Sequence, residues 1–162
     1  MYTMPTGMPG LTATDHLFEQ MHPENMFGNE FTTTPLMLRD SGDTFRILAK
    51  EDSTIVQING ISLPSLNHNE HFETILTSAS IISSNRPVCV AQYSNSLGFD
   101  YTTGDPFEML LFPASYSYKK TYFKTYYNSP VSNFDFLINI ITKSSSISTV
   151  FFGWGSNSGF CI

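Results

Sequence analysis

Short apolar runs separated by turn-forming residues, at intervals of roughly ten residues, constrain the fold of this chain more than any other feature. Between residues 43 and 93 these runs are 45–50, 55–58, 61–63, 72–76 and 87–93. None of them repeats its apolar residues with the period of an α-helix. Aromatic, β-branched and hydroxyl side chains, which fit a pleated surface, are abundant. The pattern therefore predicts about four or five short strands in this stretch.

The residues between the runs indicate where the chain turns. Four turn formers at 51–54 join the first two runs, which predicts a β-hairpin. Asn59-Gly60 predicts a tight turn after the second run. The polar residues 83–86 predict a further turn before a strand that Pro87 opens.

Further apolar runs follow at 107–112, 122–126, 134–141 and 149–152. Strands at this spacing predict an all-β fold, an antiparallel β-sandwich-like meander of short strands, with propeller-like blades as the alternative. We expect residues 1–14 to form a flexible arm, since they are rich in Met, Pro, Gly and Thr without periodicity. Residues 15–162 are expected to form a single β-rich domain.

The charge of the chain narrows its possible partners. It has 14 acidic and 8 basic residues and a formal net charge of −6. An acidic chain with so few basic side chains is a poor candidate for binding nucleic acid. No stretch reaches the roughly 18 apolar residues needed to span a bilayer. The first residues of this chain also lack the basic and apolar regions of a signal peptide.

The residue types that perform catalysis or bind metals form no recognisable pattern. His68 and His71 lie three residues apart, so in an extended segment they point to opposite faces. The carboxylates near Asp43 and Asp105 stand beside Gly or Ser, where turn capping is the commoner role and calcium binding the alternative. We therefore expect no catalytic residues, no metal and no cofactor. A hydrolase, the remote alternative, would need His16 or His71 within hydrogen-bond reach of a Ser or Asp.

The two cysteines allow two interpretations. Cys89 lies inside an apolar run, which predicts a buried, inert thiol, whereas Cys161 lies in a terminus that contains Gly and Ser. The alternative is a disulfide between Cys89 and Cys161, or between one of them and a cysteine outside this chain. Their spacing by itself does not decide the redox compartment.

Two regions carry the candidate binding residues. The loop from Ser94 to Asp105 contains Gly, Asn and Tyr, and the run from Tyr116 to Tyr127 interleaves tyrosines with lysines. Aromatic side chains dominate contacts with proteins and carbohydrates. The alternative for the second region is a strand whose aromatic face packs inward. The candidates are Asp100, Tyr101, Asp105, Tyr116, Tyr118, Lys119 and Tyr122.

One short pattern occurs twice. Gly42-Asp43-Thr44-Phe45 and Gly104-Asp105-Pro106-Phe107 both place Gly-Asp-x-Phe directly before an apolar run. The repeat marks either two related β-units or the same turn chemistry used twice.

Four sequence blocks between residues 15 and 113 form a series with a characteristic order and spacing. They are DHLFEQ at 15–20, GDTFRILAKEDSTIVQING at 42–60, ISSNRPVCVAQYS at 82–94 and GDPFEMLLFP at 104–113. In this order they resemble the N-terminal domain of IgGFc-binding proteins. Thr14 and Phe27 stand where relatives commonly have a Cys and a Trp.

The resemblance implies a non-enzymatic, secreted or cell-surface module of mucus or matrix type. Its partner would be an extracellular protein or a glycan, such as immunoglobulin Fc or mucin. A module that only packs against neighbouring domains of a secreted protein is the alternative. Because the family's domain is longer, we expect this chain to correspond to part of it.

Overall fold

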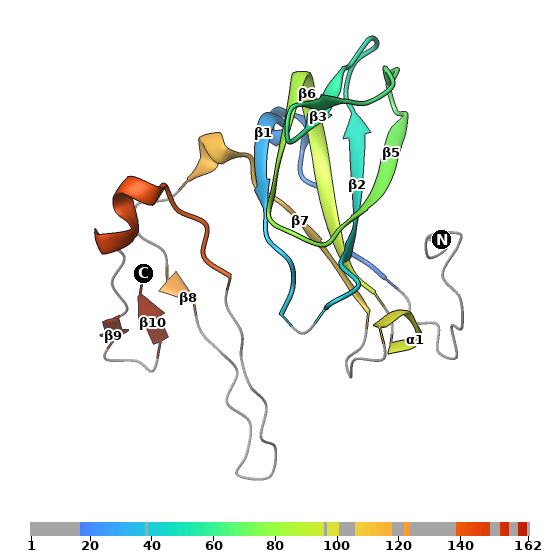
Figure 1. The fold of residues 1–162 in the computed structure, drawn as a ribbon. Helices are drawn as coiled ribbons and strands as arrows, with labels where there is room; N and C mark the ends of the chain where they lie inside the picture. Colours follow the sequence, from blue (N-terminus) through green and yellow to red (C-terminus); the bar gives the residue numbers. More distant parts are fainter. Residues whose placement is uncertain are drawn as a thin grey trace. The chain divides into compact units, whose positions relative to one another are not determined.

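A seven-stranded antiparallel sheet forms the larger part of the structure (Figure 1). The computed structural model describes residues 17–37, 39–95, 97–100, 106–117, 122–123, 139–149, 153–155 and 159–161. The chain divides into two units, Met1–Tyr116 and Ser117–Ile162. The seven-stranded sheet belongs to the first unit, and a three-stranded sheet belongs to the second.

The strands of the first unit are joined by loops and short helical turns. They are β1 (Gly28–Thr33), β2 (Asp43–Ala49), β3 (Val56–Ile58), β4 (Ile61–Ser62), β5 (His71–Leu76), β6 (Ser80–Ser94) and β7 (Phe107–Leu110). The helical turns are a 3₁₀ turn at Glu24–Met26, α1 (Leu97–Asp100) and a 3₁₀ turn at Ala114–Tyr116. The predicted all-β fold with antiparallel strands is therefore confirmed.

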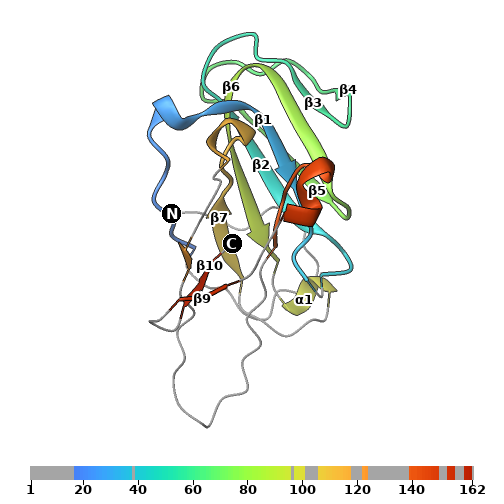
Figure 2. The same ribbon diagram turned by 90° about the vertical axis from the view of Figure 1, so that its left-hand side faces the viewer.

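Strand β6 organises the sheet, because it pairs with β1, β2, β3 and β7. Its first part, up to Ser84, pairs with β3 and with most of β1. Its last part, from Val88 onward, pairs with β2 and β7, and Val88 also lies opposite Gly28 of β1. Figure 2 shows β6 bending over one end of the sheet between these two parts. The sheet is therefore curled, and its strand order, β4-β3-β6-β2-β5, departs from the order in sequence.

The hydrophobic core lies inside the curl. Phe31 of β1, Val56 of β3 and Ile82 of β6 pack in one cluster with side chains of β2 and with later residues of β6. The buried members are Phe31, Phe45, Ile47, Ala49, Val56, Leu66, Ile82, Val88 and Val90. Burial of these side chains, at roughly 1.5–3 kcal/mol for each large one, is the main force that holds the two halves of the sheet together.

Two local predictions are wrong. The expected hairpin between β2 and β3 does not form, because β2 pairs with β5 on one side and β6 on the other. The apolar run of β2 is buried on its core face and needs a central position in the sheet. The expected turn at 83–86 is a continuous part of β6, where the polar residues occupy the bend and Asn85 accepts a bond from Ile55 N (2.7 Å).

The turn at Asn59-Gly60 is confirmed. Strands β3 and β4 pair on either side of this turn. Both turn residues have a positive φ, 50° at Asn59 and 82° at Gly60. These values suit the tight hairpin turns in which Asn and Gly are preferred, because they tolerate the left-handed region.

The two Gly-Asp-x-Phe patterns lead into strands on either side of β6, but their phenylalanines occupy different environments. Phe45 is opposite Gln92 and is 1% exposed, whereas Phe107 is opposite Ser94 and is 44% exposed. The second pattern is thus displaced by two residues along β6. The phenylalanines of the repeat are not equivalent in packing.

The second unit contains β8 (Tyr122–Phe123), β9 (Gly153–Gly155) and β10 (Gly159–Cys161), in the order β8-β10-β9. A 3₁₀ helix spans Ser144–Thr149. Of the later runs predicted as strands, part of 122–126 is a strand, whereas residues 139–141 are not and Thr149 ends the 3₁₀ helix. The division into an arm over 1–14 and a domain over 15–162 stays a prediction.

Candidate functional site

The face of the sheet that points away from the core carries the charged side chains of the central strands. Register places Arg46 of β2 opposite Glu73 of β5 and Ala91 of β6. It also places Tyr93 of β6 opposite Glu108 of β7. Because side chains alternate along a strand, all these residues lie on the face opposite Phe45 and Ile47. We call it the outer face.

A hollow of about 170 Å³ lies on the outer face. Its lining comes from β2, β5, β6 and β7, with one side chain from the segment before Pro23. The lining residues are Met21, Arg46, Leu48, His71, Cys89, Ala91, Tyr93, Glu108 and Leu110. The hollow therefore combines apolar side chains with the Glu108 carboxylate, the Arg46 guanidinium and the His71 imidazole. A second carboxylate, that of Glu73, contacts Arg46.

A chain of polar contacts crosses the outer face. Arg46 Nε lies 2.6 Å from Glu73 Oε2, and its guanidinium carbon lies 5.6 Å from the centre of the Tyr93 ring. The Tyr93 hydroxyl donates to Glu108 Oε1 at 2.9 Å. The Arg46 and Glu73 side chains are only 22% and 29% exposed, so water screens this pair less than a surface pair. Four strands are thus linked through their side chains as well as their backbones.

Cys89 is a free, buried thiol on this face. Burial, and secondly the negative charge of Glu108, raise its pKa from 9.0 to about 11. The thiolate is the reactive form, so Cys89 is inert at neutral pH. This agrees with the predicted buried, inert thiol. The alternative disulfide to Cys161 stays a prediction, because Cys161 belongs to the second unit.

The raised pKa predicts slow alkylation of Cys89. In a Cys161→Ser variant, iodoacetamide should react with the native protein at pH 8 at least about tenfold more slowly than with the urea-unfolded protein, because the native pKa is about 11. The neutral thiol contributes stability below pH 9 that is lost as the pH rises toward 11. Mass spectrometry of timed samples measures the rate. Equal native and unfolded rates would contradict this assignment.

His71 lines the hollow on the β5 side. Leu48 is opposite both His71 and Cys89, on neighbouring strands, so two strand spacings of about 4.8 Å separate their backbones. In the part of the chain that the structure describes, His71 makes no hydrogen bond to a Ser or Asp. His68 instead contacts Lys50 O through its ring Nδ1, and its backbone N–H donates to Asp52 Oδ1 (2.9 Å).

Carboxylates in the described loops cap turns or join strands. Glu70 accepts from Asn67 N (2.7 Å), and Glu51 pairs with Arg86 (2.6 Å). Among the described residues, no group of three or more His, Cys, Asp or Glu side chains is placed to hold a metal ion.

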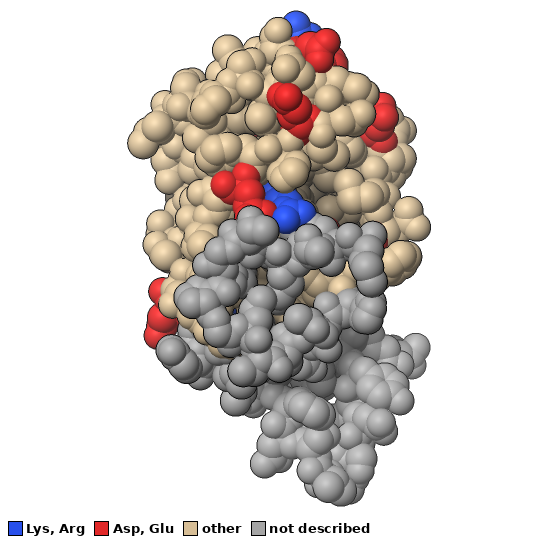
Figure 3. Space-filling view, turned by 90° about the vertical axis from the view of Figure 1, so that its right-hand side faces the viewer, with Lys and Arg blue, Asp and Glu red and all other residues tan. Residues whose placement is uncertain are grey.

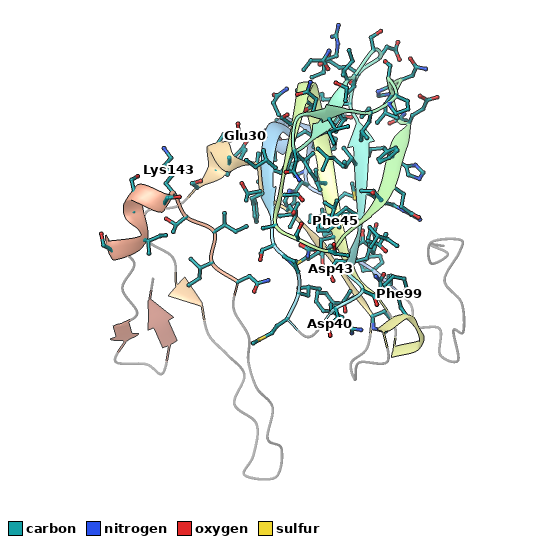
Figure 4. All side chains as sticks on the ribbon, viewed as in Figure 1. Glu30, Asp40, Asp43, Phe45, Phe99 and Lys143 are labelled. Carbon is teal, nitrogen blue, oxygen red and sulfur yellow. The ribbon has the colours of Figure 1, made fainter. Side chains whose placement is uncertain are left out.

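A buried polar cluster fastens two loops to the beginning of β2. Asp43 Oδ2 accepts from Leu36 N (2.7 Å) and from Gln92 Nε2 (2.8 Å), and the Gln92 amide also donates to Thr34 O (3.0 Å). These bonds hold the loop before β2. Figure 4 shows Asp43 and Phe45 on the sheet, with Asp40 and Phe99 near the same end.

The loop after β6 is anchored at the same end. Asn95 Oδ1 accepts from Thr44 Oγ1 (2.8 Å), and Asn95 Nδ2 donates to Gly42 O (3.0 Å). Asn95 is 1% exposed, so its amide has exchanged water for these partners. The beginning of the predicted 94–105 binding loop is therefore rigidly placed beside the β1–β2 loop.

The structure locates the predicted binding residues only in part. Tyr116 ends a 3₁₀ turn, is half-buried, and donates its hydroxyl to Asn25 O (3.2 Å). Asp100 ends α1, and Tyr122 begins β8. The others, Tyr101, Asp105, Tyr118 and Lys119, lie outside the described residues.

The polar chain on the outer face was not among the predicted sites. One sequence signal for it exists: Arg46 and Glu108 are single charges within apolar runs, which is costly unless each charge has a partner. The identity of the partners depends on strand register, which the sequence pattern does not specify.

The sequence was also compared with models of known protein families. The sequence model described as IgGFc binding protein matches residues 3–160. The chain belongs to this family. Neither the comparison with curated proteins nor that with solved structures found a match. For this IgGFc-binding family member, no helix within the described ranges is long and apolar enough to cross a membrane.

Proposed function

We propose that this chain is a non-enzymatic, extracellular binding module that recognises a protein partner, with a glycan as the alternative ligand. Family membership over residues 3–160 is the observation that carries the proposal. The name of the family refers to immunoglobulin Fc, which makes Fc the first ligand to test. The compartment proposed is the secreted or cell-surface one.

The anchored end of the sheet supports recognition through loops. The bonds of Asp43 and Gln92 hold the 34–42 loop, and those of Asn95 hold the start of the next loop. Loops placed by a rigid scaffold lose less conformational entropy when they bind. We propose that the loop from Ser94 to Asp105, including Asp100, Tyr101 and Asp105, contacts the partner. The second proposed contact is the Tyr116–Tyr127 region, with Tyr116, Tyr118, Lys119 and Tyr122.

The chemistry of the outer face supports a non-enzymatic role. Arg46, Glu73, Tyr93 and Glu108 contact one another, and the pKa of the Cys89 thiol is raised rather than lowered. A nucleophilic thiol would need the opposite shift.

Binding of the recombinant chain to immobilised Fc, mucin glycans and matrix proteins tests the proposal. We expect at least one of them to be bound, and scrambling residues 96–105 to weaken that binding by at least about tenfold. The matched control permutes residues 77–79, an exposed loop outside the proposed contact. Binding of none of the three ligands, or equal losses in both variants, would contradict the proposal.

A further inference from the structure

Strand β5 is an open edge of the main sheet in the part of the chain that the structure describes. It ends the sheet and pairs only with β2 among the described strands; Figure 1 shows it at the margin of the sheet. An open edge presents unpaired backbone N–H and C=O groups to another chain. The backbone of His71–Leu76 continues in regular register with β2, without a shift.

The backbone hydrogen bonds at the end of β2 identify which groups of β5 point outward. Ala49 N donates to Glu70 O (2.9 Å), and Lys50 N donates to Pro87 O (3.2 Å). Odd-numbered residues of β2 therefore bond to β5, and even-numbered residues bond to β6. Alternation then makes Ile47–Phe72 and Phe45–Thr74 hydrogen-bonded pairs. The N–H and C=O groups of His71, Glu73 and Ile75 consequently point away from β2.

The other margins of the sheet are short or interrupted. β4 has two residues and β7 has four. In β1 the register shifts between Gly28 and Glu30, and Gly28 packs so closely on Pro113 that a Cβ would overlap it. Such interruptions commonly block edge pairing.

β5 lacks these protective features. Its sequence, HFETIL, contains no Pro and no Lys. Its one carboxylate, on Glu73, is neutralised by Arg46 at 2.6 Å. Figure 3, viewed from the side of the molecule where β5 lies in Figure 1, shows a described surface that is mostly uncharged. Phe72 and Leu76 are half-buried against the core, so an added strand would cover their remaining exposed area.

We propose that two copies of this chain associate through the outer edges of β5, antiparallel to each other. With Phe72 on the two-fold axis, His71 lies opposite Glu73 of the second copy, and Glu73 lies opposite His71 of the second copy. This register joins outward-pointing groups of both copies and brings the two Phe72 rings together. A register centred on Glu73 would instead place like charges directly opposite each other, which is unfavourable.

Sedimentation velocity of the full chain over a wide concentration range tests the association. We expect a reversible monomer–dimer equilibrium. His71→Pro removes an outward N–H without removing a bond to β2, and should weaken the dimer by at least about tenfold. The control His71→Thr keeps the N–H and the β propensity, and should have a smaller effect. A monomer at every concentration, or equal dimerisation of both variants, would overturn the proposal.

Amide hydrogen exchange by NMR on the unmodified chain provides a second test that needs no variant. At high concentration, the amides of His71 and Glu73 should gain protection, while those of Phe72 and Thr74 stay protected throughout. Absence of this alternation in the dimer would show a different interface. If the chain stays monomeric and these amides gain protection only when Fc is added, the edge binds a partner strand, and self-association is wrong.

Discussion

Replacing Phe45 with alanine is expected to lower the free energy of unfolding by about 4 kcal/mol. Phe45 is 1% exposed and packs in the core cluster formed by both halves of the sheet. Removing its ring leaves a cavity that the surroundings fill only in part, because β2 is itself held in register by β5 on one side and β6 on the other. Urea denaturation followed by far-UV circular dichroism measures the change.

The control for Phe45→Ala is Phe107→Ala, which changes the same position of the repeated Gly-Asp-x-Phe pattern. Phe107 is 44% exposed at the beginning of β7, so we expect a loss of less than about 1 kcal/mol. If the two substitutions cost the same, the assignment of Phe45 to the core, and of Phe107 to the surface, is wrong.

Asp43→Ala is expected to destabilise the first unit by about 3 kcal/mol. The carboxylate is fully buried and accepts from Leu36 N and Gln92 Nε2, and alanine would leave both donors without this acceptor. Because the Gln92 amide also bonds to Thr34 O, the loop before β2 should loosen as well. Denaturation measures the stability, and amide exchange of Leu36 measures the loosening.

Two further variants separate the hydrogen bonds of Asp43 from general effects of charge. Asp40→Ala removes an exposed carboxylate three residues away and should change stability by less than about 0.5 kcal/mol. Asp43→Asn keeps one acceptor oxygen and should cost less than Asp43→Ala. Equal losses for Asp40→Ala and Asp43→Ala would show that the buried bonds contribute nothing specific.

Some features of the outer face depend on neighbouring residues in the sequence and others on strand pairing, and only the former were predictable. Burial of Cys89 was predictable, because the apolar residues around it require an inward or covered strand. The contact between Arg46 and Glu73 was not, since these residues are 27 positions apart and meet only through the β2–β5 register. Tyr93 and Glu108 meet in the same way across β6 and β7. A long-range pair requires knowledge of which strands are neighbours.

The sequence by itself determined the all-β class, the turn at Asn59-Gly60 and the resemblance to the family that the chain belongs to. These follow from side-chain period, from the conformational preferences of single residues and from ordered motifs. Only the tertiary structure decided that β6 pairs with four strands and that Phe45, not Phe107, enters the core. The physical reason is that alternation specifies which side chains share a face, whereas the choice of neighbouring strand depends on the burial that the whole curled sheet achieves.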